Sequence, residues 1–542
     1  MSRRGVAQVA AGILASRLTG LVRERVAAHY LGVSAFGDVF AAVFRGPNVV
    51  QNLLGEQALS ASFIPLYAQM TAQGRRDDAA RFASACFALL VVLAASIALA
   101  GVLFAEPIVA LLNPGLLQDA AAVEAGDQVI DRYPIAVAGV RIVFPMTALL
   151  VVAAWCLGVL NTHGRFFLSY FAPVLWNGSV IAAFAWVGTQ AVGAGIAGGR
   201  RLVLAACVGA LLGAALQLAV QMPAALRLLP TFRPRLSLEE PGVREAVARF
   251  GPALLGRGAV QLSGWLDLVL ASFLTVGTLA ALGWAQRIYL LPVALFGISI
   301  AAVELPELAR IAAAERAREM PRRLAVAFRR SAFVVAPTVV GFLALGFLIV
   351  SLLYRGGSFG RADTWIVYLV LCAYTVGLPA TVVSRLLQNV YFAAGDTGTP
   401  ARVAFGRLAV GAMAGAGAGF ALDRVSLALV VPDVGAHALS LAAVGLALGS
   451  ASAAWFELAM LRRALPRGEG VGEGAAGLFS WRAAAPPVAA AVASAAACGA
   501  LWWRLDALPA LGQAAIILPA YAALYLALGW KRLRRELRPR TR

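Results

Sequence analysis

Long apolar runs alternate with short polar segments along the chain, and about fourteen of the runs approach 20 residues. Since ~20 residues of helix cross the apolar core of a bilayer, each run predicts one membrane-spanning helix. The second run, 35–70, is interrupted by Pro47 and Gly55, so it fits either one kinked helix or a span followed by an interfacial helix. The predicted spans centre near residues 18, 50, 92, 146, 178, 212, 262, 292, 340, 376, 410, 448, 491 and 518.

Arginine-rich and arginine-poor segments alternate between the runs, which predicts the orientation. Basic residues concentrate on the cytoplasmic side of membrane proteins. Arg3 and Arg4, the segment 227–249 and the basic stretch after Lys531 are therefore expected in the cytoplasm, and the acidic loop 106–131 outside. Both termini on one side require an even number of spans.

The apolar runs before and after the basic segment 227–249 form two loosely corresponding halves of about six spans each. This arrangement predicts an all-α membrane protein with two six-helix lobes around a central cavity and two additional C-terminal helices. The expected divisions are an N-terminal lobe at 1–228, a cytoplasmic linker at 229–246, a C-terminal lobe at 247–465, a Gly-rich linker at 466–479, two further spans at 480–530 and a basic tail at 531–542.

Composition supports this class: 61% of the 542 residues are hydrophobic and 13% are charged, against about 25% charged in soluble domains. A net charge of +19 would suit a nucleic-acid binder, but the basic residues lie mostly in short loops, so no nucleic-acid partner is expected. Enzyme signatures for nucleotide, serine or zinc chemistry are missing, and the scattered cysteines and histidines predict unpaired buried thiols and no metal site. We therefore expect that the protein is not an enzyme and uses no cofactor. Transport against a gradient would be driven by an ion gradient, the membrane potential or the substrate's own gradient.

Arginines inside the apolar runs are the main candidate for chemistry. A guanidinium near mid-membrane costs at least ~2.5 kcal/mol, so several of them predict a hydrated interior that accepts an anion. The planar fork of arginine matches phosphate oxygens, and a cluster of forks suits a pyrophosphate. Arg25, near the outer end of its run, is expected to snorkel. The arginines in question are Arg17, Arg23, Arg25, Arg45, Arg257 and Arg287.

Polar positions in the first two runs follow helical spacing. In the first run, Arg17 and Glu24 are seven residues apart and share a face, which would let them pair. The second run has a narrow polar arc that predicts a face toward a cavity; internal ion pairs and helix caps are the alternative. In the second half, Asp267 fits an ion site or a salt bridge equally well. The arc consists of Asp38, Arg45, Asn52 and Glu56.

Specific strings resemble the MurJ (MviN) family of bacterial lipid II flippases, within the multidrug, oligosaccharide-lipid and polysaccharide exporter superfamily. The resemblance covers roughly residues 5–460. Its most distinctive part is Ser16-Arg-Leu-Thr-Gly-Leu-Val-Arg-Glu, Gly37-Asp-Val-Phe, Arg45-Gly-Pro-Asn and Gly55-Glu-Gln-Ala-Leu-Ser-Ala-Ser-Phe-Ile-Pro. Further matches are Leu160-Asn-Thr-His-Gly-Arg-Phe, Ala172-Pro-Val-Leu-Trp-Asn, Gln286-Arg, Tyr354-Arg-Gly-Gly-Ser-Phe and Asp396-Thr-Gly-Thr-Pro.

The resemblance implies a transporter that flips the undecaprenyl-pyrophosphate-linked disaccharide-pentapeptide from the inner to the outer leaflet of the cytoplasmic membrane for cell wall synthesis. Two lobes would enclose a cationic cavity, and the two last helices would form a groove for the lipid tail. Arg17, Arg23 and Arg287 map as cavity arginines, with Asp38 and Glu56 as acidic partners. Lipid II, membrane lipids and a coupling ion are the expected partners.

Two positions depart from the family pattern. In the family, consecutive arginines often follow Pro-Asn and two variable residues, where this chain has Gln51-Asn52. An acidic residue is also common three positions after the second-half arginine, where this chain has Leu290. Our hypothesis is that Arg45 or Arg257 compensates. The predicted substrate-binding residues are Arg17, Arg23, Glu24, Asp38, Arg45, Asn48, Gln51, Asn52, Glu56, Arg257 and Arg287.

Since a shared fold does not fix the cargo, two alternatives stay open. One is export of another lipid-linked glycan or of an amphipathic drug. The other is a membrane scaffold that transports nothing, which intramembrane arginines argue against because charge without a use is costly in lipid.

Overall fold

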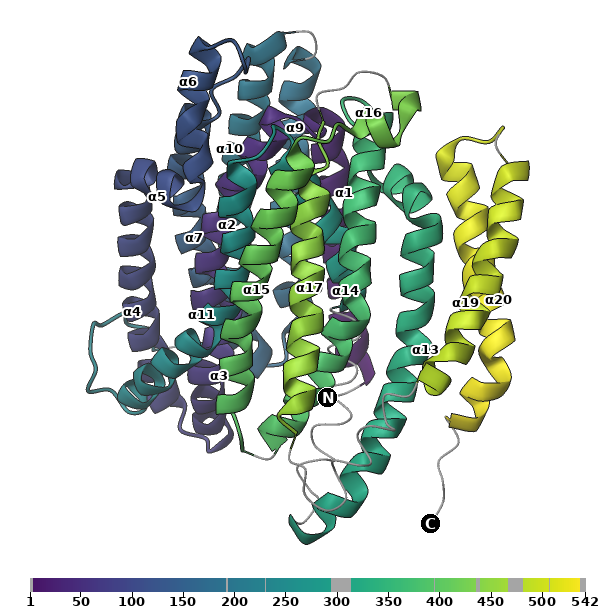
Figure 1. Ribbon diagram of the computed structural model, residues 1–542. Helices are drawn as coiled ribbons and strands as arrows, with labels where there is room; N and C mark the ends of the chain where they lie inside the picture. The colour runs from purple at the N-terminus through teal and green to yellow at the C-terminus, as the bar shows by residue number, and fades with distance from the viewer. Residues whose placement is uncertain are drawn as a thin grey trace. The chain divides into compact units, whose positions relative to one another are not determined.

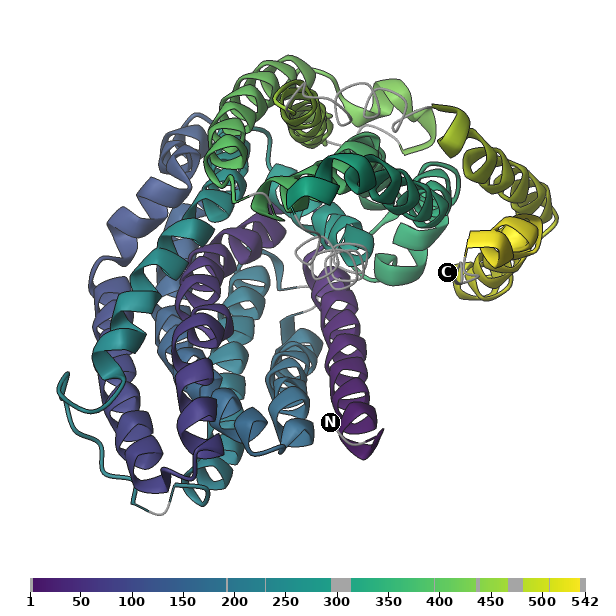
Figure 2. The same ribbon diagram turned by 90° about the horizontal axis from the view of Figure 1, so that it is seen from below.

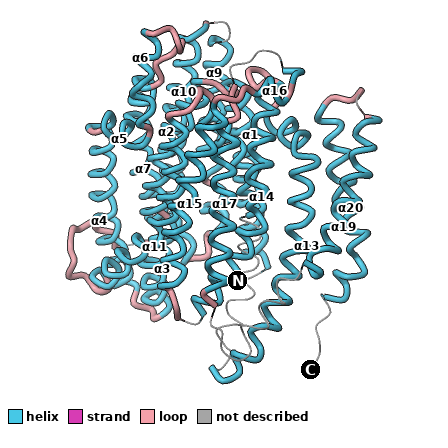
Figure 3. The backbone as a smooth tube through the Cα atoms, in the orientation of Figure 1, coloured by secondary structure: helices cyan, strands magenta, loops and turns pink. Residues whose placement is uncertain are grey.

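The computed structural model describes residues 3–191, 194–229, 231–293, 313–393, 395–434, 439–465, 481–505 and 507–536. Within these ranges the chain is built from helices and turns, with two isolated bridges and no strand (Figures 1 and 3). The all-α prediction is confirmed. All five cysteines are free thiols, four of them buried, as predicted.

Ten helices in the described part of the chain are long and apolar enough to cross a membrane. They coincide with ten of the fourteen predicted spans, from Arg76–Leu103 to Ala510–Gly529. The other four predicted spans, near residues 18, 50, 262 and 292, contain the six intramembrane arginines, and each includes residues whose side chains are not described. The count of fourteen therefore stays a prediction.

Packing divides the chain into two compact units: residues 1–280 with 356–359, and residues 281–355 with 360–542. The predicted lobes and their linker at 229–246 come from corresponding halves of the sequence, whereas these units come from contacts between residues. The lobes therefore stay a prediction. The first unit contains α1 (Arg3–Leu31), α2 (Ala35–Leu54), α3 (Glu56–Ala72), α4 (Arg76–Leu103), α5 (Ala105–Leu112), η1 (Pro114–Gln118), α6 (Asp119–Glu124), α7 (Tyr133–Thr162), α8 (Phe166–Phe171), α9 (Pro173–Ala191), α10 (Gly195–Leu226) and α11 (Val243–Ser272).

An aromatic core holds the first unit together. Phe63 of α3 stacks on Phe82 of α4 with ring centroids 5.5 Å apart, and it also contacts Trp155 of α7, which is fully buried. The interrupted run 35–70 therefore forms two helices that separate at Gly55, and the second of them packs into this core rather than lying on its surface.

The second unit contains the helical residues 281–293, followed by α13 (Ala313–Tyr354), α14 (Arg361–Ala393), α15 (Gly398–Asp423), α16 (Leu427–Val430), η2 (Pro432–Val434), α17 (Ala442–Arg463), α19 (Trp481–Arg504) and α20 (Ala510–Glu536). The last two form a hairpin, drawn in yellow in Figures 1 and 2, and pack against α13. The Gly-rich linker 466–479 lies outside the described residues.

Small residues bring helices together in both units. A Cβ on Gly449 of α17 would lie 2.3 Å from the Cα of Gly415 on α15, so the two backbones touch there. In the first unit, Gly213 of α10 approaches the backbone of Trp176 on α9 to 2.8 Å by the same measure. Lipid gives apolar helices no hydrophobic reason to associate, so close packing at small residues is the main attraction between them.

Candidate functional site

α1 presents arginine in two different settings. Arg17 is exposed, and within the described residues its guanidinium forms no ion pair. Arg23 is partly buried; it pairs with the adjacent Glu24 and lies over the Trp176 ring, with its guanidinium carbon 4.6 Å from the ring centroid. The carboxylate of Glu24 thus pairs with Arg23, and the sequence-based pairing of Glu24 with Arg17 is wrong.

The neighbouring helix fixes the position of this part of α1. Asn177 of α9 donates to the Thr19 hydroxyl at 3.2 Å and to the Ser16 carbonyl at 3.3 Å. Both contacts lie within one turn of Arg17. α1 is therefore held against α9 while Arg17 remains available.

The polar arc of α2 does not share one environment. Asp38 is 1% exposed, Arg45 and Gln51 are partly buried, and Asn48 and Asn52 are exposed. Within the described residues, the side chains of Asn48, Gln51 and Asn52 form no hydrogen bond. The C-terminal half of α2 thus presents spare amides, whereas its N-terminal end is enclosed by protein.

Asp38 belongs to a buried ion-pair network, the alternative that the sequence left open, rather than to an open cavity face. Its Oδ2 accepts from Arg132 Nη1 at 2.8 Å and from the Gly277 N–H at 2.7 Å, and its Oδ1 accepts from the Ala280 N–H at 2.8 Å. Arg132 also donates to Asp119, from Nε at 2.6 Å and from Nη2 at 2.8 Å. All three charged side chains are at most 2% exposed, so no position is left for a substrate.

This network joins segments that are distant in sequence. Asp38 lies in the first turn of α2, Asp119 begins α6, and Arg132 directly precedes α7. The N–H of Gly277 belongs to the turn after α11, and the N–H of Ala280 to the first turn of the next helix. A second contact at the same place, from the Gly115 N–H to the Ser272 hydroxyl at 3.0 Å, also holds the end of α11. The network therefore anchors α11 within the first unit.

Arg45 contacts α11 directly. A Cβ placed on Gly264 would lie 1.8 Å from Arg45 Nη2, so any side chain at this position would displace the guanidinium from where it lies. Arg257 is on the same helix, but its side chain, like that of Glu56 on α3, lies outside the described residues. The structure thus brings Arg45 and the helix of Arg257 together without describing Arg257 itself.

The second unit contains the last predicted residue, Arg287, whose guanidinium carbon lies 4.8 Å from the centroid of the buried Trp284 ring. Tyr289, two residues after Arg287, stacks on Tyr374, and its hydroxyl lies 3.3 Å from the Thr381 hydroxyl. The ring of Trp284 orients Arg287 from one side.

A charged group that sequence reasoning missed lies in the second unit. Glu457 of α17 is 2% exposed and accepts from Arg407 Nη1 at 2.6 Å and from Gln388 Nε2 at 2.8 Å. Arg385, one turn before Gln388 on α14, is exposed and forms no ion pair within the described residues. Both arginines lie inside apolar runs, so the criterion that selected Arg17 would also have found them.

An apolar groove of about 610 Å³ runs along the second unit. Its walls are α13, α20 and residues 288–292, with Tyr521 and Tyr525 on α20. Tyr521 donates to the Pro337 carbonyl at 2.8 Å, so its ring is fixed in the wall. Of the two C-terminal helices, α20 alone contributes to this groove.

Comparison with protein families matches residues 27–512 to the family described as Lipid II flippase MurJ. Among curated proteins, the chain is 28% identical to a Lipid II flippase MurJ of Burkholderia cenocepacia, over 75% of this chain and 76% of that protein. It is 31% identical to a probable lipid II flippase MurJ of Rhizobium meliloti, over 84% and 79%.

Two solved structures are similar in fold. One is a Lipid II flippase MurJ in an inward closed conformation, with a TM-score of 0.68 and 20% identity over 97% of this chain and 99% of that one. The other is an inward-facing multidrug resistance MATE family transporter of the MOP superfamily, with a TM-score of 0.59 and 14% identity over 83% and 96%. At these identities the likeness concerns the fold alone.

Proposed function

The chain belongs to the lipid II flippase MurJ family, and on that premise we propose that it moves lipid II from the inner to the outer leaflet of the cytoplasmic membrane by alternating access. It would act as a transporter in cell wall synthesis and not as an enzyme. Both termini would lie in the cytoplasm, and an ion gradient or the membrane potential would supply any driving force.

The observation that carries this proposal is a set of polar side chains on α1 and α2 whose hydrogen-bonding groups have no protein partner among the described residues. Arg17, Asn48, Gln51 and Asn52 have side chains without protein partners among the described residues, in a protein of which 61% is hydrophobic. A polar group in that setting needs water or a ligand, because lipid offers it no hydrogen bond. A diphosphate headgroup linked to a sugar and a peptide offers acceptors for arginine and partners of both kinds for amides.

The roles of the individual residues follow from their surroundings. Arg17 would hold the diphosphate, Arg23 would bind it while Glu24 and Trp176 orient its guanidinium, and the amides of α2 would contact the sugar or peptide. Arg45, Arg257 and Arg287 would complete the cationic surface, with Glu56 as an acidic partner. Asp38 has a different role, since it positions α2 and α11.

Gly264 offers a test of Arg45 that leaves the arginine in place. In Gly264→Ala the new methyl group would displace the guanidinium, so we expect lipid II flipping to fall about three- to tenfold while the protein still folds. Flipping would be measured in proteoliposomes. Gly251→Ala on the same helix is the matched control, because nothing lies within 4 Å of its Cβ position. Adding Gly264→Ala to Arg45→Ala should cause no further loss; an additive loss would contradict this role of Arg45.

The groove beside α20 would hold the lipid tail, because its walls are apolar and an alkyl chain gains close van der Waals contacts along them. Ala522 lines it, and Ala522→Trp should slow the flipping of lipid II about fivefold, equivalent to about 1 kcal/mol. Ala523→Trp is the control, since Ala523 is exposed on the same helix and does not line the groove. A lipid II analogue with a shortened tail should be insensitive to both changes. Equal effects of the two variants, or an equal loss with the short analogue, would contradict the assignment.

Depletion of the protein in its own cells tests the function as a whole. We expect lipid II to accumulate in the inner leaflet, measured by its accessibility to an externally added lipid II-cleaving enzyme. Accumulation of a different lipid-linked glycan would instead support the exporter alternative. An unchanged distribution of lipid II and other lipid-linked glycans between the leaflets would support a scaffold, whatever happens to cell shape.

A further inference from the structure

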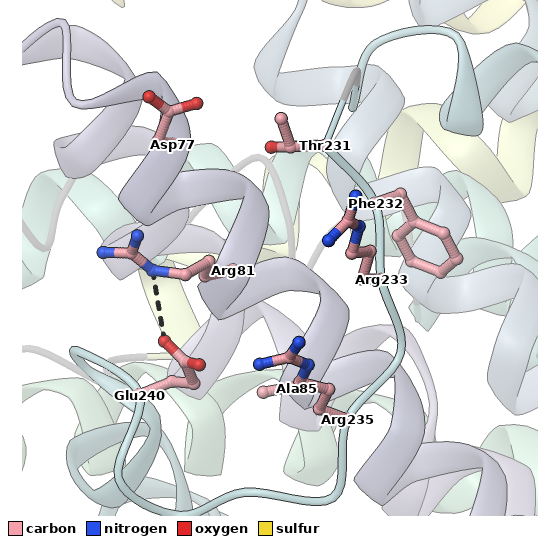
Figure 4. A pocket seen from close by; sticks show the side chains of 8 residues that line it. All are labelled: Asp77, Arg81, Ala85, Thr231, Phe232, Arg233, Arg235 and Glu240. Carbon is pink, nitrogen blue, oxygen red and sulfur yellow. Dashed lines mark ion pairs between the residues drawn. The ribbon is translucent and has the colours of Figure 1, made fainter.

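A second candidate anion site lies in the first unit, and none of its lining residues is among those proposed to bind lipid II. It is a pocket of about 440 Å³ between α4 and the segment that connects α10 to α11 (Figure 4). Asp77, Arg81 and Ala85 form one wall; they lie at intervals of four on one face of α4. The connecting segment forms the other wall, with Thr231, Phe232, Arg233, Arg235 and Glu240.

Contacts at both ends hold the connecting segment in place. At one end, the Arg233 N–H donates to the buried Ser84 hydroxyl at 3.2 Å, and the Phe232 ring packs on Phe87 with centroids 5.2 Å apart. At the other end, Arg81 Nε lies 3.3 Å from Glu240 Oε2, an ion pair drawn in Figure 4. The wall is therefore a fixed surface rather than a free loop.

The sequence Arg233-Pro234-Arg235 directs two guanidiniums to the same side. Proline restricts its own φ and favours an extended conformation for the residue before it. In an extended chain, residues i and i+2 point in the same direction. Figure 4 accordingly shows Arg233 and Arg235 both reaching from the connecting segment toward α4.

The charges in the pocket are unequally paired. Arg81 is occupied, since it contacts Glu240 and also forms an ion pair with Asp78 at 2.5 Å. Arg233 and Arg235 form no ion pair within the described residues, and neither does Asp77. Two guanidiniums and a hydroxyl that line one pocket of ligand size suit a tetrahedral oxyanion better than they suit water alone.

We propose that this pocket binds a phosphate group, with Arg233 and Arg235 as its ligands and Thr231 as an additional donor. The segment is predicted to face the cytoplasm, so the phosphate would belong either to the headgroup of an acidic phospholipid or to a free phosphorylated compound of the cytoplasm. The site is independent of flipping: it would exist whether or not the chain carries lipid II.

The experiment compares three forms of the purified full-length protein: wild type, Arg233→Gln/Arg235→Gln, and Arg200→Gln/Arg201→Gln. The last is the matched control, because it removes two exposed arginines from the start of α10 and changes the net charge equally. In the first arm, equilibrium dialysis in neutral detergent measures the binding of radiolabelled inorganic pyrophosphate. In the second arm, native mass spectrometry measures phosphatidylglycerol retained from phosphatidylcholine nanodiscs that contain it.

We expect the pocket variant to lose one binding equivalent per chain in one of the two arms, with affinity at that site lowered at least about tenfold, while the control behaves as wild type. Loss in the first arm would identify a free phosphorylated ligand, and loss in the second an acidic lipid. Identical binding by the pocket variant and wild type in both arms would overturn the proposal, as would an equal loss in the control.

Asp77→Asn gives a test that does not depend on losing a contact. Its carboxylate lines the pocket and would repel an anion, so its neutralisation should tighten binding about threefold to fivefold in the same arm. This gain should weaken at high salt, because the site is open to solvent. Unchanged or weaker binding by Asp77→Asn at low salt would contradict a phosphate in this pocket.

Discussion

Replacing Arg17 by alanine should lower lipid II flipping about 10- to 100-fold while leaving the amount of folded protein unchanged. Arg17 is exposed on α1 and forms no ion pair within the described residues, so its removal leaves no buried carboxylate behind. A hydrogen bond to a charged group contributes ~1.5–3 kcal/mol, so the loss of one such bond to the diphosphate corresponds to about 10- to 100-fold in rate. Proteoliposomes with fluorescent lipid II would report the rate.

Two variants of α1 make this result specific. Arg17→Lys keeps the charge but loses the planar fork, so its rate should lie between those of wild type and Arg17→Ala. Arg25→Ala removes another exposed arginine from the same helix and should stay within about twofold of wild type, since Arg25 is expected to snorkel toward the surface. If Arg17→Ala and Arg25→Ala flip lipid II equally well, Arg17 faces lipid or bulk water and has no part in binding.

Much of this architecture could be read from the sequence because membrane crossing imposes strong local rules. A lipid-crossing helix must be about 20 residues long and mostly apolar, and ten of the predicted spans meet this condition in the structure. Arg17 could be selected for the same reason: arginine is conspicuous where nearly every neighbour is apolar. These signals need no knowledge of what the helix packs against.

Asp38 shows the limit of such reasoning, which left both a cavity face and an internal ion pair open for this residue. Helical spacing correctly places Asp38, Arg45 and Asn52 at similar angles around α2, but it gives only the angle and not the surroundings. At 1.5 Å per residue Asp38 lies about 10 Å along the axis from Arg45, far enough to meet entirely different neighbours. Its partner Arg132 is 94 residues away in sequence, and only the folded chain brings them together.

The pair of Glu457 and Arg407 was missed for a different reason. The two residues are 50 positions apart, and each lies within an apolar run where its charge could have been noticed. Helical spacing relates only residues of one helix, so it cannot pair a carboxylate of α17 with an arginine of α15.

Replacing Arg132 by leucine should lower the free energy of unfolding by about 3–5 kcal/mol. The substitution leaves Asp38 and Asp119 close together without their counter-charge, and each is 1% exposed, so water cannot replace the lost contacts. The tie between α2, α6 and the end of α11 would weaken as a result. Unfolding would be followed in detergent by denaturant titration, together with the yield of monodisperse protein.

The matched control lies on the helix that directly follows Arg132. Arg141 of α7 pairs with Glu106 at 2.9 Å, but their side chains are 49% and 61% exposed, so Arg141→Leu should change stability by only about 0–1 kcal/mol. Asp38→Asn should fall between the two, because an amide keeps one acceptor for the N–H groups of Gly277 and Ala280. If Arg132→Leu is as stable as Arg141→Leu and yet fails to flip lipid II, the buried network serves transport rather than folding, and Asp38 regains its place among the functional residues.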